Sequence, residues 1–87
     1  MKINRAASAG TLESNDILIM VAPNEEEKIE IQLDSIVMKQ FGEEIEWVIR
    51  QVLQELSITA IKLKAQDKGA LNYTIRARVE AACRRGA

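Results

Sequence analysis

The spacing of apolar residues changes along this 87-residue chain, and the change limits the folds that the chain can adopt. From about Ser35 to Leu56 the apolar residues follow one helical stripe: Phe41, Ile45, Val48, Val52 and Leu56, widened by Ile49 and Leu53. Carboxylates gather in the first half of this stretch, where they suit the helix dipole. The pattern predicts one long helix over residues 35–56, with strand-forming segments on both sides of it.

Two strands are predicted before this helix. The segment Ile17–Ala22 is apolar at every position, which indicates a strand buried on both faces, or one whose second face meets a partner. In residues 29–34 apolar and polar side chains alternate, as expected for a half-buried strand. Pro23 and Asn24 end the first segment. We expect these two strands to form an antiparallel hairpin.

Two further strands are predicted after the helix. In residues 61–66 and 71–80 the apolar side chains occupy odd positions and the polar ones even positions. Residues 67–69, which end in a glycine, suit a three-residue hairpin loop. We therefore expect residues 60–66 and 70–79 to pair antiparallel, with their basic side chains on one face: Lys62, Lys64, Arg76 and Arg78.

The predicted architecture is α+β. It is a two-layer ββαββ domain, in which a four-stranded, mainly antiparallel sheet is covered by one long helix. One alternative stays open, because Leu71, Ile75, Val79 and Ala82 also fit a helical stripe. A helix over residues 71–84 would give a ββαβα arrangement.

Length and composition suit a single domain over residues 1–87, with residues 1–9 as a flexible arm. The longest apolar run, Ile17–Ala22, is far shorter than the roughly 20 residues that a membrane span needs, so we expect no membrane partner. No apolar segment follows Lys2 and Arg5, and the single cysteine, Cys83, suits a reducing compartment. We therefore expect a cytoplasmic protein.

The charges are divided unevenly along the chain. Residues 1–57 carry a net charge of −6 and residues 58–87 a net charge of +5. The basic part has only one aromatic residue, Tyr73, which disfavours nucleic-acid binding. Such a dipolar surface suits docking onto another protein, so we predict a basic docking patch formed by Lys62, Lys64, Arg76 and Arg78.

The chain lacks the residues that most catalytic mechanisms need. It has no histidine to deprotonate a nucleophilic serine, no cluster of metal-ligand spacing and no glycine-rich phosphate loop. We therefore expect no catalytic residue and no metal. The functional classes that remain are a binding module, an inhibitor and a carrier.

A carrier needs an attachment point, and two serines are candidates. Ser14, in "AGTLESNDILIM", lies where the alternation breaks across residues 13–16, so a turn would lift it out of the sheet. Ser35, in "LDSIVM", resembles the Asp-Ser-Leu site of the four-helix acyl carrier proteins, but it follows a strand and occupies a helix N-cap position. The residue pattern alone does not decide whether Ser14 or Ser35 is the attachment point.

Three segments, "AGTLESND", "MKQFGEEI" and "DKGALNYTIRARVEAA", resemble the acyl carrier protein of citrate lyase, its gamma subunit, nearly end to end. The resemblance implies that Ser14 carries 2′-(5″-phosphoribosyl)-3′-dephospho-CoA through a phosphodiester. This group would hold acetyl and citryl thioesters while citrate is cleaved to oxaloacetate and acetate.

The same resemblance implies several protein partners. They are the citrate lyase alpha subunit (acyl transferase), the beta subunit (citryl lyase), a prosthetic-group transferase and an acetylating ligase. Three alternatives remain: a carrier of the related malonate decarboxylase type, an unmodified protein-interaction domain, and a phosphopantetheine carrier modified at Ser35.

Overall fold

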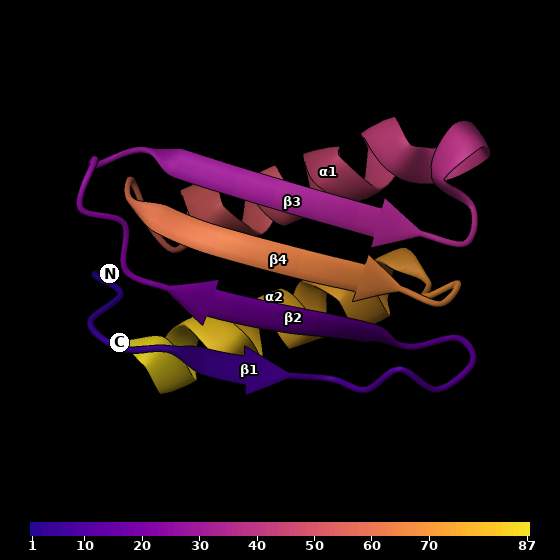
Figure 1. Ribbon diagram of the computed structural model, residues 1–87, viewed down its shortest axis with the longest axis horizontal. Coiled ribbons are helices and arrows are strands. Elements are labelled where there is room, and N and C mark those ends of the chain that lie inside the picture. Colours follow the sequence, from indigo (N-terminus) through magenta and orange to yellow (C-terminus); the bar gives the residue numbers. More distant parts are fainter.

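The computed structural model describes residues 1–87 as four strands and two helices (Figure 1). The strands are β1 (Ala7–Ala9), β2 (Ile17–Ala22), β3 (Ile29–Ser35) and β4 (Ile61–Asp67). The helices are α1 (Met38–Glu55) and α2 (Asn72–Gly86). The predicted α+β class with a four-stranded sheet is therefore confirmed, with a second helix in addition.

The four strands form one mixed sheet in the order β1-β2-β4-β3. β2 pairs antiparallel with both β1 and β4, whereas β3 and β4 run parallel. α1 joins the two parallel strands, because such a connection needs a crossover. The central place of β2 explains its apolar sequence: Ile17, Ile19 and Val21 are buried, and Leu18 and Met20 are half-buried on the other face.

Both helices lie on the same face of the sheet, behind it in Figure 1, so the molecule has two layers. Neither helix is long and apolar enough to cross a membrane. α1 faces the sheet with a buried stripe of helical spacing: Ile45, Val48, Ile49, Val52 and Leu53. The 18 buried hydrophobic residues form one core between the helices and the sheet.

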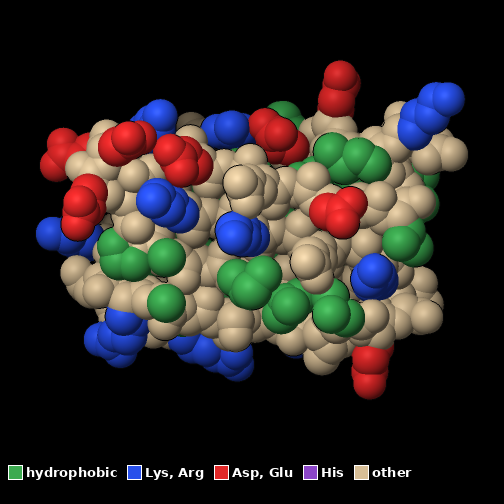
Figure 2. Space-filling view, in the orientation of Figure 1, with side chains coloured by type: hydrophobic (Ala, Val, Ile, Leu, Met, Phe, Trp, Pro, Cys, Tyr) green, Lys and Arg blue, Asp and Glu red, His purple; other side chains and the backbone are tan.

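The other face of the sheet is open. Figure 2 looks onto this face and shows hydrophobic side chains interspersed with basic and acidic ones. The exposed residues Lys62 and Lys64 belong to it, because they alternate along β4 with buried residues. In the β3–β4 register Glu30 lies opposite Lys62. The open face is therefore mixed in charge rather than uniformly basic.

The prediction of a strand over residues 70–79 is wrong, because these residues belong to α2. The ambiguity is resolved by burial: Ile75, Val79 and Ala82 are fully buried, whereas Tyr73 is 71% exposed. Residues 75, 79 and 82 share a helix face, while residues 73 and 75 would share a strand face. The alanines and arginines that follow also favour a helix. The C-terminal helix of the alternative therefore forms, but the element order is βββαβα rather than ββαβα, because an additional strand precedes the others.

The predicted hairpin between residues 17–22 and 29–34 is also wrong. Both segments are strands, but β4 lies between them and pairs with each. The fourth strand comes instead from the N-terminus, where Ala7–Ala9 form β1. The expected flexible arm over residues 1–9 is therefore wrong as well. Ile3 is buried in the core, and the backbone N–H of Asn4 donates to the carbonyl oxygen of Gly86 at 2.7 Å.

Three loops meet at one end of the sheet, on the right of Figure 1. They are residues 10–16 before β2, residues 36–37 after β3 and residues 68–71 after β4. They meet there because β3 and β4 are parallel and β2 runs opposite to β4. Ser14 and Ser35 therefore lie at the same end of the molecule, which is called the loop end below.

We expect Ile75→Ala to lower the free energy of unfolding by about 3 kcal/mol, because the removed methyl groups leave a cavity in the core. The free energy of unfolding of the matched variant Tyr73→Ala should stay within about 0.5 kcal/mol of that of the original sequence, since the Tyr73 ring is exposed. Urea unfolding measures both values. Similar losses for the two variants would instead support the alternating strand.

Candidate attachment site

Ser14 occupies a tight turn at the loop end. The backbone N–H of Asp16 donates to the carbonyl oxygen of Glu13 at 3.1 Å and closes the turn. Asn15 has a φ of 65°, a left-handed conformation that asparagine tolerates better than most residues. Ser14 is the second residue of the turn and is exposed. The expected turn at Glu13–Asp16 is therefore present.

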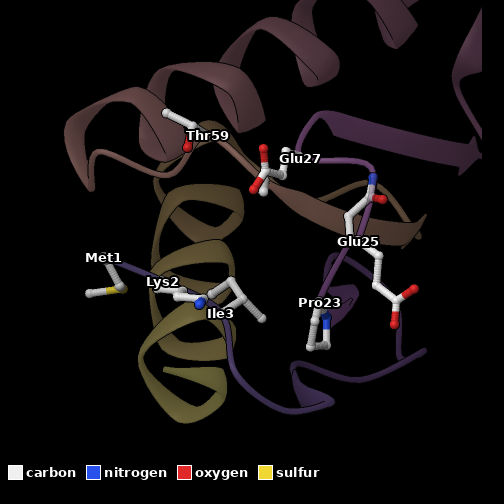
Figure 3. Close-up of a pocket in the computed structure, with 9 residues that line it drawn as sticks. Met1, Lys2, Ile3, Pro23, Glu25, Glu27 and Thr59 are labelled. Carbon is white, nitrogen blue, oxygen red and sulfur yellow. The ribbon is translucent and has the colours of Figure 1, made fainter.

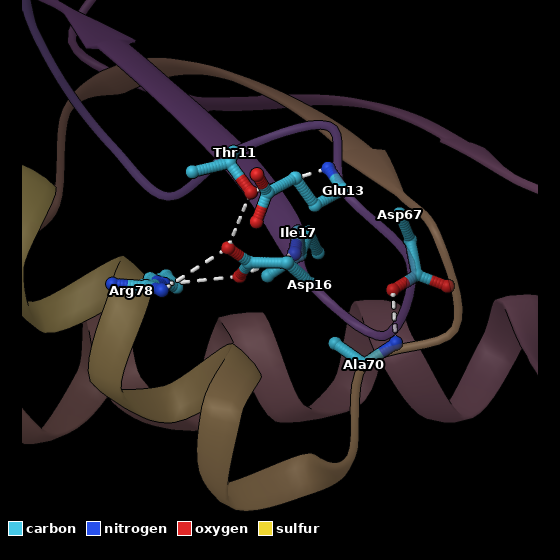
Figure 4. A network of polar contacts seen from close by, with 7 residues as sticks. All are labelled: Thr11, Glu13, Asp16, Ile17, Asp67, Ala70 and Arg78. Atoms are coloured by element: carbon cyan, nitrogen blue, oxygen red, sulfur yellow. Dashed lines mark hydrogen bonds and ion pairs between the residues drawn. The ribbon is translucent and has the colours of Figure 1, made fainter.

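The turn is held from below by Asp16, which is 9% exposed (Figure 4). Its carboxylate accepts hydrogen bonds from the Thr11 hydroxyl at 2.7 Å and from the Ile17 backbone N–H at 2.7 Å. It also accepts two hydrogen bonds from the guanidinium of Arg78, from Nε at 3.0 Å and from Nη2 at 3.1 Å. Arg78 lies on α2, so this ion pair fixes the turn to the helix layer.

The hydrogen bonds from Arg78, with smaller contributions from Thr11 and Ile17, lower the pKa of Asp16 to about 2 although burial opposes this shift. The carboxylate is therefore ionised at neutral pH. Two well-aligned contacts to a guanidinium also fix its orientation. The base of the turn is consequently rigid and charged, while its tip is open to solvent.

Backbone contacts connect the turn to the loop after β4. The N–H of Asn15 donates to the carbonyl oxygen of Lys68 at 2.8 Å, and the N–H of Lys68 donates to the carbonyl oxygen of Asp16 at 2.9 Å. These bonds extend the β2–β4 ladder by one step beyond Ile17 and Asp67. At the start of the turn Gly10 has a φ of 94°, and a Cβ there would lie 1.8 Å from the carbonyl oxygen of Ile17. Only glycine fits at that position.

The hydroxyl of Ser14 takes no part in this network. The side-chain hydrogen bonds of the turn are made by Thr11, Asp16 and Arg78. The Ser14 oxygen is therefore exposed and makes no hydrogen bond within the protein. No histidine exists in the chain to take up its proton, so a reaction of this hydroxyl needs an external catalyst. The site fits a covalent ligand that another protein attaches.

Ser35 has a structural role, although not the predicted one. It is the last residue of β3, and Val37, not Ser35, is the N-cap of α1. Its hydroxyl donates to the Asp67 carboxylate at 2.7 Å and accepts the Val37 backbone N–H at 3.0 Å. The prediction of a capping serine is thus wrong by two residues. Ser35 is half-buried and its hydroxyl is engaged in hydrogen bonds, unlike that of Ser14.

Asp67 holds the other two loops together. It is 2% exposed, and besides Ser35 it accepts the backbone N–H groups of Gly69 at 3.1 Å and Ala70 at 2.9 Å. Figure 4 shows the bond to Ala70. A buried carboxylate of this kind is stable because its oxygens are paired with donors. The loop that follows β4 is thereby fixed beside the Ser14 turn.

The four basic residues of the predicted docking patch are not brought together. Lys62 and Lys64 lie on the open face of the sheet, whereas Arg76 and Arg78 lie on α2 across the sheet. Arg76 pairs with Glu55, and Arg78 pairs with Asp16. The prediction of one patch depended on a strand over residues 70–79, and it fails because that segment is helical.

The sequence analysis gave no role in the site to Thr11, Asp16 and Asp67, and it placed Arg78 in a docking patch rather than beneath the turn. One signal existed for Asp16, because an acidic residue directly before a buried strand needs a partner. Its partner could not be found in the same way, since Arg78 is 62 positions away. Arg78 was also assigned to a strand that does not form.

The single thiol of the chain is not available as a carrier group. Cys83 is fully buried in α2, and this burial raises its pKa to about 11. The thiol is therefore neutral and inaccessible at neutral pH. No group of three or more His, Cys, Asp and Glu side chains that could hold a metal is present.

A hollow of about 650 Å³ lies at the end of the sheet opposite to Ser14. Figure 3 shows the residues that line it. It is lined by the N-terminal residues Met1, Lys2 and Ile3, and by residues that follow β2 or precede β4: Pro23, Asn24, Glu25, Glu27, Thr59 and Ala60. Three of its nine lining residues are hydrophobic, and it shares no residue with the Ser14 turn. We therefore assign it no part in attachment.

We expect Asp16→Asn to lower the free energy of unfolding by about 2 kcal/mol at pH 7, because the ion pair to Arg78 is lost. The folded-state pKa of Asp16 lies below its ordinary value of 3.8, so ionised Asp16 stabilises the fold above about pH 4. That stabilisation disappears as the pH falls through about 2. Unfolding curves between pH 2 and 7 should therefore converge for the two proteins at low pH. Parallel curves would contradict the role of this pair.

The chain has relatives among known proteins. It matches the family model for the malonate decarboxylase delta subunit (MdcD), an acyl carrier protein model, over residues 4–86. Two citrate lyase acyl carrier proteins of Streptococcus pyogenes, from strains Manfredo and NZ131, are each 53% identical to it over 87 residues. Both matches cover 100% of this chain and 85% of the relative.

Two solved structures share the fold. One belongs to the crystal structure of a Pseudomonas malonate decarboxylase hetero-tetramer in complex with malonate. It has a TM-score of 0.82 at 18% identity, and the match covers 100% of this chain and 93% of that chain. The other, from Thermus thermophilus, has a TM-score of 0.69 at 10% identity and covers 98% of this chain but 16% of that chain.

Proposed function

The chain belongs to the citrate lyase acyl carrier protein family, and we propose that it carries acyl groups for a citrate lyase on a prosthetic group attached to Ser14. In this role the chain is not itself a catalyst. It presents one side chain to the enzymes that modify it and to those that use the attached group. One observation carries the assignment: the exposed and uncommitted hydroxyl of Ser14 on a turn with a rigid base.

The group that we propose is 2′-(5″-phosphoribosyl)-3′-dephospho-CoA, linked to the Ser14 oxygen by a phosphodiester. When bound, it supplies a thiol on a long arm, on which acetyl and citryl groups are held as thioesters. Ser14 provides the ester oxygen, and Asn15 gives the turn its left-handed shape. Asp16 and Arg78 keep the base of the turn fixed, so that the arm swings from a constant point.

The arm explains why a small domain without catalytic groups would be useful. A tethered thioester reaches two active sites at a high effective concentration without diffusing away. We propose that these sites belong to an alpha subunit that transfers the acyl group and a beta subunit that cleaves the citryl thioester. A prosthetic-group transferase and an acetylating ligase would act on the carrier before the cycle begins. We place this complex in the cytoplasm, which the unpaired thiol of Cys83 suits.

Two residues of the predicted docking patch, Lys62 and Lys64, keep a docking role in this proposal. Lys62 and Lys64 lie on the open face of the sheet, and neither forms an ion pair within the chain. Half-buried apolar residues of β2 lie opposite them in the β2–β4 register, Met20 opposite Lys64 and Ala22 opposite Lys62. We propose that this part of the open face meets an acidic surface of a partner subunit.

A malonate decarboxylase carrier is the second candidate, because the family model and one solved structure belong to that enzyme. The identity of 53% to citrate lyase carriers, against 18% to the malonate decarboxylase chain, favours the first. Supplying the loaded carrier to each pair of enzyme subunits separates the two. Turnover of citrate alone would support the proposal, and turnover of malonate alone would support the second candidate.

We expect Ser14→Ala to abolish incorporation of the prosthetic group and citrate cleavage, since no oxygen remains for the phosphodiester. Its free energy of unfolding should change by no more than about 0.5 kcal/mol, because the side chain is exposed and makes no hydrogen bond. Intact mass of protein from a host with the transferase measures incorporation. Coupled citrate cleavage measures function.

Ser35→Ala is the matched control. It should keep the adduct and the activity but lose about 1–2 kcal/mol of stability, because the buried Asp67 carboxylate and the Val37 N–H each lose a partner. Two results would overturn the assignment: an adduct on the Ser14→Ala protein, or an adduct that Ser35→Ala removes. Absence of any adduct from the unmodified sequence would indicate an interaction domain instead.

A further inference from the structure

The exposed apolar side chains of this protein gather at the loop end. Eight large hydrophobic residues are exposed in all. Met1 lies at the opposite end and Trp47 lies in the middle of α1. The other six lie in the three loops of the loop end or in the first turns of the helices that begin there: Leu12, Ile36, Met38, Phe41, Leu71 and Tyr73. Concentration of apolar surface at one place marks a site of interaction.

Part of this surface is hollowed into a groove of about 480 Å³ between the beginnings of the two helices. Six of its nine lining residues are hydrophobic: Val37, Phe41, Ile45, Ala70, Leu71 and Tyr73. The rings of Phe41 and Tyr73 are 50% and 71% exposed, so neither is covered by the protein. Glu44 and Asn72 supply the polar side chains of the lining. The groove thus offers two aromatic rings and a few hydrogen-bonding groups.

The groove begins next to the Ser14 turn. The backbone N–H of Asn15 is bonded to the carbonyl oxygen of Lys68, and the next two residues, Gly69 and Ala70, line the groove. Gly69 also lies close to the Asn15 amide, since a Cβ there would be 3.6 Å from the Asn15 Oδ1. A group attached to Ser14 therefore starts beside residues that line the groove.

We infer that this groove holds the adenine ring of the group attached to Ser14. The inference rests on the proposed function, which supplies an arm that contains a purine nucleotide. A purine is flat and largely apolar, and exposed aromatic side chains bind such rings by stacking. The Glu44 carboxylate is an acceptor suited to the exocyclic amine of adenine. The citryl group at the other end of the arm carries free carboxylates, so it has no reason to enter an apolar groove.

Attachment makes even weak stacking effective. A tethered ring is present at a high local concentration and cannot diffuse away, so a shallow groove is sufficient. Holding the nucleotide at the loop end would leave only the pantetheine part of the arm free to move. The exposed rings of Phe41 and Tyr73 would then be covered in the loaded carrier.

Nuclear magnetic resonance of the loaded carrier tests the inference. Intact mass first establishes that each protein carries the adduct on Ser14. The chemical shifts of adenine H2 and H8 are then compared between the folded protein and the Ser14 peptide released from it by proteolysis. In the folded protein we expect both signals to move upfield, and we expect nuclear Overhauser contacts to the ring of Tyr73.

Matched variants identify the rings responsible. Tyr73→Ser should remove most of the upfield shift, and the double variant with Phe41→Ser should remove the rest. Trp47→Ser should leave it unchanged, because Trp47 is also exposed on α1 but does not line the groove. Since the Tyr73 ring is mostly in solvent, its loss should not unfold the protein.

Three results would overturn the inference. Identical adenine shifts in the folded protein and the peptide would mean that the ring is free. A shift that Trp47→Ser removes would place the ring elsewhere. Free adenine signals together with weaker subunit assembly in Tyr73→Ser would assign the groove to a partner protein. A mass without any adduct would instead overturn the proposed function and is recognised before the spectra are recorded.

Discussion

The contact between Asp16 and Arg78 is the interaction on which the arrangement of the loop end depends. It joins the residue before β2 to the middle of α2, and it therefore connects the sheet layer to the helix layer beneath the Ser14 turn. Asp16 is buried among these donors, so the loss of Arg78 would leave a buried carboxylate without its main partner. In the function proposed above, this fixed base would give the attached arm a constant starting point.

Much of the architecture could be predicted from local patterns. The long helix and the strands at residues 17–22, 29–35 and 61–67 are present, because their apolar periods match their burial. The last segment was ambiguous, since Leu71, Ile75 and Val79 satisfy both periods, and the burial of Ala82 and Cys83 decides for the helix. Strand pairing was not predictable in the same way. It depends on a parallel β3–β4 contact and on a three-residue strand with almost no pattern.

The candidate site was likewise predictable only in part. Ser14 was identified because the alternation breaks around it and because the surrounding segment resembles a known family. The residues that hold the turn were missed, since Asp16 and Arg78 are distant in sequence and meet only in the folded chain. The same applies to Asp67 and Ser35, which are 32 positions apart. Local sequence locates an exposed hydroxyl, whereas the residues that hold it in place depend on tertiary contacts.

The two chain termini lie side by side at the end of the sheet opposite to Ser14 (Figure 1). The carbonyl oxygen of Gly86 accepts the backbone N–H groups of Asn4 and Arg5, so the segments near the two termini are bonded to each other. A fused domain, an affinity tag or a solid support attached at either terminus would therefore stand on the far side of the molecule from Ser14. Joining the termini with a short linker would close the chain into a ring without disturbing the loop end.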